Sequence, residues 1–452
     1  MAAARKTSAP RGAVPRVPQS QIGESIAIVA MAVSIAAAGL LVDPRAEAAF
    51  EAPKRLATLT AIVAAALAVL MLPRLSAPLQ WRSGPIQRRV ALYLFLGAIG
   101  GALIAALTSP RRTMSLEATR VLILFGLLLP LGASRCLLRG RSRALLVVFL
   151  AASAINAVVS ILQALGVFEP LAIESIAGRV SSVGFVGNEG YLALLMALAV
   201  VASLGVASHA STLSIRAAAW GALVLFLIAL ALTRDLTGWI ALAVGAMPFG
   251  HERLVNRRRR AWAAAAMLAL VAGVIAIAGL RGRIAGLVHK AETGKLDSLL
   301  SYRPIPWAAA VEMIRERPLL GYGPGTFAAE FVPHRLRAEI FWSRRLVNPQ
   351  LNSFYAQAHC EYLQALAEAG IPAGLAADAA FAMLIVGLVR KRGRLPEPIR
   401  AEAQVILAIL LAGSIAALGW SPLQEPALAA PLLLTAGRGW RVLGDAANGD
   451  PE

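Results

Sequence analysis

A histidine with several polar neighbours interrupts an otherwise apolar chain at "HCEYLQALAEAGIPAG", residues 359–374. A neutral imidazole, with an ordinary pKa of about 6.5, can take the proton of a hydroxyl group as that hydroxyl attacks a substrate. The neighbouring Glu361, Tyr362 and Gln364 add further polar groups close to it. His359 and Glu361 stand two residues apart and no second histidine is near, so this spacing does not predict a metal site.

Three arginines occur in segments that lie between long apolar runs. They are Arg179 in "AGRVSSVGFVGNEGYLA", Arg234 in "LTRDLTGW" and Arg303 in "SYRPIPWAAAVEMIRERPLLGYGPGTF". A guanidinium group is costly at apolar depth unless it is paired, and its planar fork suits the oxygens of a phosphate. Each arginine could also be a boundary residue that meets lipid head groups or a nearby acid. Together with His359, they indicate a base and a cationic clamp for a phosphorylated substrate.

The elements that must position these residues are membrane helices. The chain has 452 residues, of which 58% are hydrophobic and 15% charged, whereas a soluble domain is about 25% charged. Runs such as "SIAIVAMAVSIAAAGLLV" approach the roughly 20 residues that cross about 30 Å of hydrocarbon. They do not alternate in polarity as the strands of a barrel do. We therefore predict an all-α, polytopic membrane protein.

Basic residues between the apolar runs predict how the protein sits in the membrane. About twelve spans are expected, beginning near residues 22, 56, 90, 118, 144, 188, 217, 237, 261, 370, 402 and 423. Every second connection is rich in arginine, as in "HERLVNRRRR", except "ASHASTLSIR", which has one arginine. Short basic loops stay in the cytoplasm. Both termini are therefore predicted to be cytoplasmic. Cys136 and Cys360 then lie on opposite sides of the membrane, which excludes a disulfide between them.

The same pattern divides the chain into five regions. They are a basic cytoplasmic tail (1–21), about nine spans (22–280), a large periplasmic loop (281–358), the C-terminal spans with the histidine stretch at their start (359–436) and a cytoplasmic tail (437–452). The loop carries eleven Lys or Arg against six Asp or Glu, a net charge of +5 that suits an anionic partner. Within it, "PWAAAVEMIRER" predicts a helix, "PLLGYGPGTF" a glycine-rich turn and "HRLRAEIFWSRRL" a second short helix.

Three motifs resemble those of the O-antigen ligase and polymerase family. "HCEYLQALAEAGIPAGL" resembles the family's His-Asn-x-Tyr-Leu-Gln followed by Glu-x-Gly-x-x-Gly. "RPIPWAAAVEMIRERPLLGYGPGTF" resembles its Arg-x-x-x-Trp block followed by Pro-Leu-Leu-Gly-x-Gly-x-Gly-x-Phe, and "RVSSVGFVGNEGYLA" resembles its Arg and Gly-Asn-x-x-Tyr-Leu-Ala stretch. The resemblance covers about residues 175–375. Cys360 stands where the family usually has asparagine, and Leu236 stands where it commonly has arginine, with Arg234 two residues earlier.

The resemblance implies a membrane glycosyltransferase with the C-type architecture. Such proteins move a glycan from an undecaprenyl diphosphate carrier to an acceptor hydroxyl at the periplasmic face of the bacterial inner membrane, without metal or cofactor. The expected partners are the lipid-linked donor, a glycan or lipid-core acceptor and the bilayer, and no nucleic acid. The candidate base is His359, the candidate diphosphate ligands are Arg303, Arg179 and Arg234, the candidate sugar or acceptor ligands are Glu361, Tyr362 and Gln364, and either Glu361 or Glu368 could orient the imidazole.

Alternatives to a ligase remain open on the sequence. A polymerase that joins carrier-linked repeats, or a protein O-oligosaccharyltransferase, would use the same donor and the same motifs. A transporter of an anionic lipid would instead place ionisable groups near the middle of the membrane, on broken helices related by an internal repeat. The sequence shows neither feature, and its informative residues gather at one predicted membrane face. An enzyme is therefore the favoured class.

Overall fold

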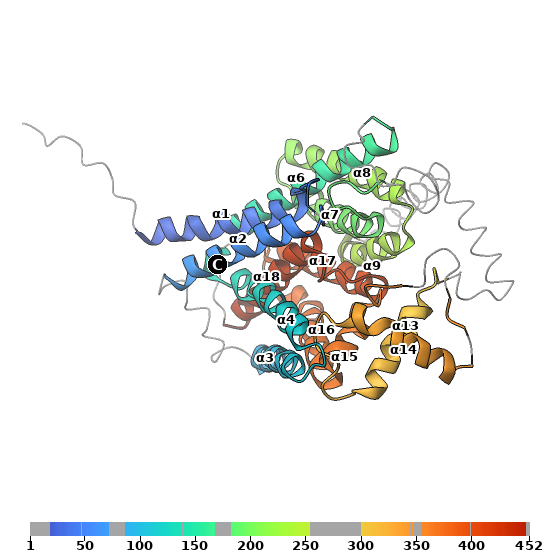
Figure 1. The fold of residues 1–452 in the computed structure, drawn as a ribbon. Coiled ribbons are helices and arrows are strands. Elements are labelled where there is room, and N and C mark those ends of the chain that lie inside the picture. The colour runs from blue at the N-terminus through green and yellow to red at the C-terminus, as the bar shows by residue number, and fades with distance from the viewer. Residues whose placement is uncertain are drawn as a thin grey trace, which may run out of the picture.

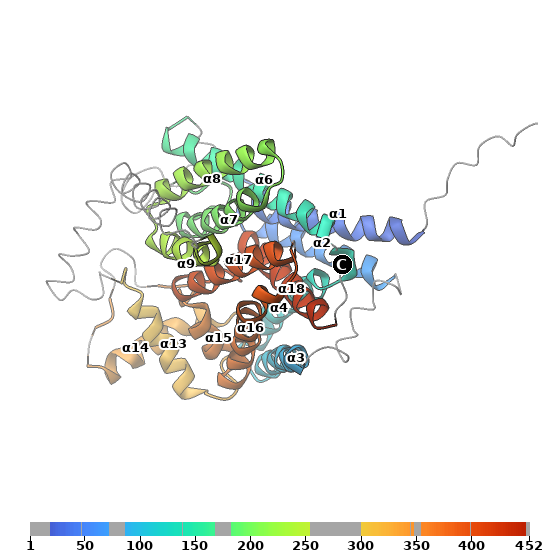
Figure 2. The same cartoon turned by 180° about the vertical axis from the view of Figure 1, so that it is seen from behind.

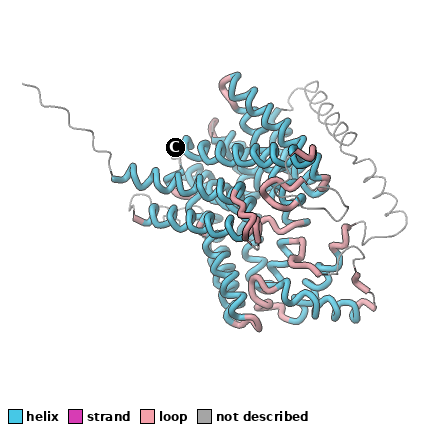
Figure 3. Tube along the Cα trace, turned by 45° about the horizontal axis from the view of Figure 1, so that its top comes forward, coloured by secondary structure: helices cyan, strands magenta, loops and turns pink. Residues whose placement is uncertain are grey.

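The computed structural model describes most of the chain and consists of helices and loops. The described residues are 19–46, 48–71, 86–137, 139–167, 182–253, 300–343, 345–347, 354–397 and 399–448. Over these residues there is no strand, as Figure 3 shows. The prediction of an all-α polytopic protein is confirmed. Arg179 and the span expected from residue 261 lie outside the described residues.

The helices follow the predicted apolar runs. In the first part of the chain they are α1 (Gln19–Leu40), α2 (Ala52–Leu70), α3 (Ile86–Leu107), α4 (Arg112–Gly126), α5 (Leu128–Gly132), α6 (Arg139–Ala164), α7 (Glu189–His209), α8 (Leu213–Thr233) and α9 (Leu236–Arg253). Later come α13 (Pro304–Glu316), α14 (Phe327–Phe341), α15 (Glu361–Ala369), α16 (Ile371–Lys391), α17 (Ile399–Gly419) and α18 (Pro426–Asn448). Within the described ranges, nine helical segments are long and apolar enough to cross a bilayer. Helices α9 and α18 lie at two further predicted positions.

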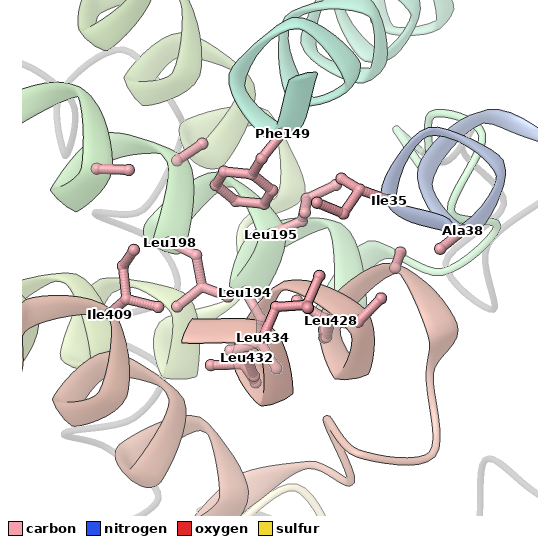
Figure 4. Close-up of a cluster of buried hydrophobic side chains, with 14 of the residues drawn as sticks. Ile35, Ala38, Phe149, Leu194, Leu195, Leu198, Ile409, Leu428, Leu432 and Leu434 are labelled. Carbon is pink, nitrogen blue, oxygen red and sulfur yellow. The ribbon is translucent and has the colours of Figure 1, made fainter. Parts of the chain in front are cut away.

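Helix α7 forms the centre of the bundle. In its most apolar stretch 89% of the residues are buried, against 67% in α17 and fewer in the other candidate spans of the described chain. A helix that is apolar all round belongs inside a bundle, and α7 packs against α8, α9 and α17. Figure 4 shows the core that results, with α7 side chains between those of α1, α6, α17 and α18. The labelled residues are Ile35, Ala38, Phe149, Leu194, Leu195, Leu198, Ile409, Leu428, Leu432 and Leu434.

Ion pairs join several helices at one end of the bundle. Arg438 in the middle of α18 donates from Nε to Glu402 Oε1 at 2.8 Å and from Nη2 to Oε2 at 3.1 Å. Arg141 at the start of α6 pairs with Glu24 at the start of α1 at 2.6 Å. Figures 1 and 2 show the C-terminal end of the chain on the same side as the start of α1. The described chain therefore begins and ends at one end of the bundle.

A buried lysine joins helices at the opposite end, which we call the Lys54 end. Lys54, at the start of α2, is fully buried and donates from Nζ to the carbonyl oxygens of Phe185 at 2.7 Å and Val186 at 3.2 Å. Its ammonium also lies 3.9 Å from Oε1 of Glu425. Lys54 thus connects the segment that leads into α7 with the turn between α17 and α18.

We expect a Lys54→Met variant to be strongly destabilised, because the substitution leaves the Glu425 carboxylate and two carbonyl oxygens buried without their cation. Removal of one partner of a buried ion pair typically costs about 3–5 kcal/mol. The measurement is thermal or denaturant unfolding of the purified protein in detergent. Arg55→Met is the control, because the neighbouring pair of Arg55 with Glu51 is 43% and 56% exposed and should contribute less than about 1 kcal/mol. Equal losses in both variants would contradict the prediction.

Helices α13, α14 and α15 form a smaller unit with a core of its own. Ile305 and Met313 of α13 pack with Phe327 and Phe331 of α14 and with Tyr355 before α15. Figures 1 and 2 show α13 and α14 at the end of the bundle away from the start of α1. The unit therefore lies at the Lys54 end.

The second helix of this unit differs from the prediction. We expected it to begin at His334, after Pro333, but α14 begins at Phe327 and contains Pro333. Its first turns are held in the core by Phe327 and Phe331, which are 1% and 0% exposed. Burial of these two rings outweighs the cost of a proline inside the helix.

Candidate functional site

Three segments that are distant in the sequence meet around one indole ring at the end of α17. The ring of Trp420 lies 5.2 Å from the imidazole of His359, edge to face at 86°. The Arg303 guanidinium carbon lies 5.6 Å from the centroid of the same ring. The phenol ring of Tyr191 lies 5.1 Å away at 54°. The structure thus brings together His359 and Arg303, the predicted base and the predicted diphosphate ligand.

The "GNEGY" motif places the start of α7 against this ring. Asn188 caps the helix, since its side-chain oxygen accepts from the backbone N–H groups of Gly190 at 2.9 Å and Tyr191 at 3.2 Å. A Cβ atom on Gly190 would lie 1.9 Å from a ring carbon of Trp420. Only glycine therefore allows the indole ring to approach α7. The Tyr191 hydroxyl then reaches the Gln357 side-chain oxygen at 2.5 Å, two residues before His359.

His359 is held by packing in a strained backbone conformation. Its φ of 50° lies in the left-handed region, which a residue with a side chain adopts at a cost. The edge of its ring meets Tyr355 at 5.8 Å and 87° as well as Trp420. Nδ1 is buried and has no hydrogen-bond partner among the described residues. Burial lowers the pKa of His359 to about 4, with a further contribution from the positive charge of Arg303, so the imidazole is neutral at pH 7.

Arg303 lies at the N-terminal end of α13, between α9 and α17. Its Nη1 and Nη2 atoms are 3.5 and 3.4 Å from the hydroxyl oxygen of Thr237 at the start of α9. A Cβ atom on Gly419 would lie 2.9 Å from Nη1. The side chain is half-buried. Its guanidinium group therefore lies close to the start of α9 and the end of α17.

Arg234 and Leu236 lie at the tip of the hairpin between α8 and α9. Arg234 has a left-handed φ of 55°, and the side chains of both residues are exposed. The hairpin contacts Arg303 through Thr237. Arg234 thus lies on an element of the site, whereas Arg179 cannot be placed because it lies outside the described residues.

Glu361 and Tyr362, at the start of α15, tie this helix to the end of α17. A side-chain oxygen of Glu361 accepts the backbone N–H of Leu423 at 3.0 Å. The Tyr362 hydroxyl donates to the carbonyl oxygen of Ser414 in α17 at 2.9 Å. Burial raises the pKa of Glu361 to about 7. These contacts fix α15 beside Trp420.

The side chains of Gln364 and Glu368, both in α15, form hydrogen bonds with two neighbouring segments. One is the histidine segment just before α15, and the other is the glycine-rich turn that leads into α14. The Gln364 side-chain oxygen accepts the N–H of Ala358 at 2.9 Å, and its amide group donates to Glu368 Oε1 at 3.2 Å. The Glu368 carboxylate also accepts the N–H groups of Gly325 at 2.9 Å and Phe327 at 3.0 Å. Gln364 is 4% exposed and Glu368 8%. Their side chains thus hold the glycine-rich turn and the strained histidine segment in place.

Two motif glycines permit a close approach of the backbone at this turn. Gly321 has a φ of 63°, and a Cβ atom there would lie 2.3 Å from the carbonyl oxygen of Glu368. Gly370 has a φ of 81°, and its Cβ would lie 2.2 Å from the carbonyl oxygen of Leu319. Both positions combine a left-handed backbone with no room for a side chain. The "GYG" turn and the end of α15 therefore pack directly against each other.

The sequence motifs do not include Trp420, Lys54 or Glu425. Trp420 lies in "LGWSPLQEP", 61 positions after His359, and nothing in the spacing of that segment indicates the contact. Lys54 lies next to Glu51 and Arg55 in "EAPKR", so the sequence does not indicate that its side chain is buried or that it pairs with Glu425.

Comparison with known proteins finds a family match for part of the chain. Residues 221–377 match the model of the family described as O-antigen ligase. The match contains Arg234, Arg303 and His359, and it excludes Tyr191 and Trp420. No curated protein matches the chain. The matched region contains two of the three motifs and supports the family resemblance, and the apolar helices of the described chain make it a multi-pass membrane protein. Over residues 221–377, the chain is therefore similar to the O-antigen ligase family.

Proposed function

We propose that the protein is a membrane glycosyltransferase that moves a glycan from an undecaprenyl diphosphate carrier to an acceptor hydroxyl, as an O-antigen ligase does. The observation that carries the proposal is the contact of His359 and Arg303 with one indole ring, at 5.2 and 5.6 Å. The match of residues 221–377 to the ligase family supports a glycan-joining reaction at this site. No metal or other cofactor is needed in this scheme, because the diphosphate of the carrier is already a good leaving group.

Arg303 stabilises the leaving group in this mechanism. As the bond between the sugar and the diphosphate breaks, negative charge accumulates on the departing diphosphate oxygens. A fixed guanidinium group stabilises this charge more in the transition state than in the ground state. Arg234 on the adjoining hairpin and Arg179 are proposed as further ligands of the diphosphate. The expected products are the glycosylated acceptor and free undecaprenyl diphosphate.

His359 acts as the base for the acceptor. The acceptor oxygen attacks the anomeric carbon of the sugar from the face opposite the diphosphate, while its proton passes to the imidazole. Nδ1 is buried, so Nε2 is the nitrogen that accepts this proton. One base and one cationic clamp on opposite sides of the anomeric carbon suit a single displacement with inversion.

The proposed donor also fits the location of the site. The lipid chain of the carrier would remain in the bilayer among the apolar helices, with its diphosphate at the Lys54 end of the bundle. We propose that this end faces the periplasm and that both termini face the cytoplasm, in accord with the arginine-rich connections of the sequence. Tyr362, Gln364 and Glu361 are proposed to position the site through their contacts within the protein.

The pH dependence of transfer should reflect the environment of His359. A base must be neutral to accept a proton, and the pKa of His359 is lowered to about 4. The value of kcat/KM for the donor should therefore stay level from pH 7 down to about pH 5 and fall below that, whereas an imidazole with an ordinary pKa would lose half its activity at about pH 6.5. Transfer by purified protein between pH 4 and 8 provides the measurement.

A Glu361→Gln variant is the control for this profile. Glu361 has a pKa raised to about 7 and lies two positions from the base. If the acidic limb belongs to His359, it should remain near pH 4 in this variant. A limb near pH 6.5 in the wild type, or one that disappears in Glu361→Gln, would contradict the assignment.

Deletion of the gene, followed by analysis of carrier-linked glycans, tests the proposed function in the cell. A ligase predicts long glycan chains that remain on the carrier and are missing from the acceptor. Single unpolymerised repeats on the carrier would instead assign the protein to the polymerases. An unchanged glycan profile at the surface would contradict both assignments.

A further inference from the structure

Trp420 lies outside the matched region and outside the motifs, yet it contacts His359, Arg303 and Tyr191. We infer that Trp420 is a positioning residue for glycan transfer, whose indole ring sets the distance and orientation between the His359 imidazole and the Arg303 guanidinium. This inference rests on the proposed function. It assigns a role to a residue that acts through the base and the arginine.

The imidazole needs such a support because no hydrogen bond from the described residues fixes its Nδ1 atom. In many hydrolases a carboxylate accepts a hydrogen bond from the Nδ1–H group and so orients the ring. Here Nδ1 has no partner within the described chain. The nearby carboxylate of Glu361 accepts the N–H of Leu423, and Glu368 binds Gly325 and Phe327. Edge contacts with Tyr355 and Trp420 are therefore what hold the ring.

The indole ring is itself held from several sides. The backbone N–H of Trp420 donates to the carbonyl oxygen of Ala416 at 3.0 Å, so the residue continues the last turn of α17. Gly190 leaves room for the ring against α7. In the segment that follows Trp420, the backbone N–H of Leu423 donates a hydrogen bond to Glu361, and Glu425 lies beside the buried Lys54. A ring fixed in this way can hold the reacting groups at defined positions relative to α7, α15 and α17.

The same ring also attracts Arg303. A guanidinium group within about 6 Å of an indole centroid is drawn to the negative face of the ring, and Arg303 lies at 5.6 Å. The side chains of His359 and Arg303 therefore both pack against the indole ring of Trp420. Loss of that ring should displace both side chains, and a misplacement of about 1 Å can lower a rate by about 10²-fold.

Kinetics of Trp420→Ala and Trp420→Phe test this role. Trp420→Ala should lower kcat by about 10²-fold and change the KM for the donor less, because a displaced Arg303 loses most of its effect in the transition state, where charge accumulates on the diphosphate. Trp420→Phe keeps an aromatic ring and should stay within about tenfold of the wild type. Trp342→Ala is the control, since Trp342 is 44% exposed at the end of α14, and it should transfer at the wild-type rate.

A labelling measurement that needs no donor separates packing from activity. Diethyl pyrocarbonate acylates exposed neutral imidazoles, and mass spectrometry can follow the reaction at His359. Labelling should be faster in Trp420→Ala than in Trp342→Ala, and the acidic limb of kcat/KM should move from about pH 4 toward 6.5 as water reaches the imidazole. Both results would support the inference.

Three outcomes would overturn the inference. They are a wild-type kcat in Trp420→Ala, a Phe variant as slow as the Ala variant, which would indicate direct use of the indole N–H, and unchanged labelling of His359. If wild-type protein transfers no glycan at all, the proposed function fails. If wild-type and Trp420→Ala proteins transfer equally well, only the positioning role fails.

Discussion

A His359→Asn variant is expected to remain folded and to transfer glycan about 10²–10⁴-fold more slowly than the wild type, because the acceptor hydroxyl loses its base. Asparagine is the informative substitution at this position. It tolerates the left-handed backbone that His359 adopts at a φ of 50°, whereas alanine would add strain to the loss of the base. The measurement is the initial rate of transfer by purified protein with a carrier-linked donor.

The His209→Ala variant provides the control for this experiment. His209 closes α7 at the opposite end from Asn188 and interacts with Gln404 at 3.0 Å. It has no place in the proposed chemistry and should transfer near the wild-type rate. Rapid transfer by a correctly folded His359→Asn protein would remove His359 from the mechanism.

Arg303→Lys is expected to lower kcat by about 10²–10³-fold, although the positive charge is kept. A lysine ammonium is a point charge and cannot reproduce the planar fork that binds two phosphate oxygens at once. It would also lose the geometry that places the guanidinium beside Thr237 and the ring of Trp420. Steady-state kinetics with varied donor concentration should show the loss mainly in kcat.

Arg315→Lys is the matched control, because Arg315 lies on the same helix. Its side chain is 48% exposed and pairs with Glu312 at 3.3 Å. This variant should transfer near the wild-type rate. Near-normal activity of Arg303→Lys would assign Arg303 to the structure of the site instead of to catalysis.

The membrane helices were predictable because their length is set by the bilayer and their composition by its interior. The predicted starts near 188, 217, 370 and 402 lie within four residues of the starts of α7, α8, α16 and α17. Helix α14 was placed too late, since the prediction began it at His334 and the helix begins at Phe327. The burial of Phe327 and Phe331 decided its actual start, and burial depends on tertiary packing.

The candidate site was predictable only in part. His359 and Arg303 lie within recognisable motifs, and the structure brings them together. The expected contacts of the polar α15 residues with a sugar or acceptor stay a prediction, and the structure shows hydrogen bonds of Gln364 and Tyr362 to groups within the protein. Their side chains could not be assigned from the sequence, because a polar side chain serves backbone groups and ligands with the same atoms.

Trp420 shows most clearly what the sequence leaves out. Its contacts with Tyr191, Arg303 and His359 join residues that are 61 to 229 positions apart in the chain. No local sequence pattern indicates these contacts, because they depend on how α7, α13, α15 and α17 pack together. The ion pair of Lys54 and Glu425 is a second example, because these two residues are separated by most of the sequence.

Reconstitution of the purified protein in lipid vesicles is the most direct test of the central chemistry. The vesicles would contain a donor glycan on undecaprenyl diphosphate, and a chelator and an acceptor would be present. We predict that glycosylated acceptor and free undecaprenyl diphosphate appear in equal amounts, and that both disappear with the His359→Asn protein. A donor that stays intact, or that crosses the bilayer without losing its glycan, would contradict the account.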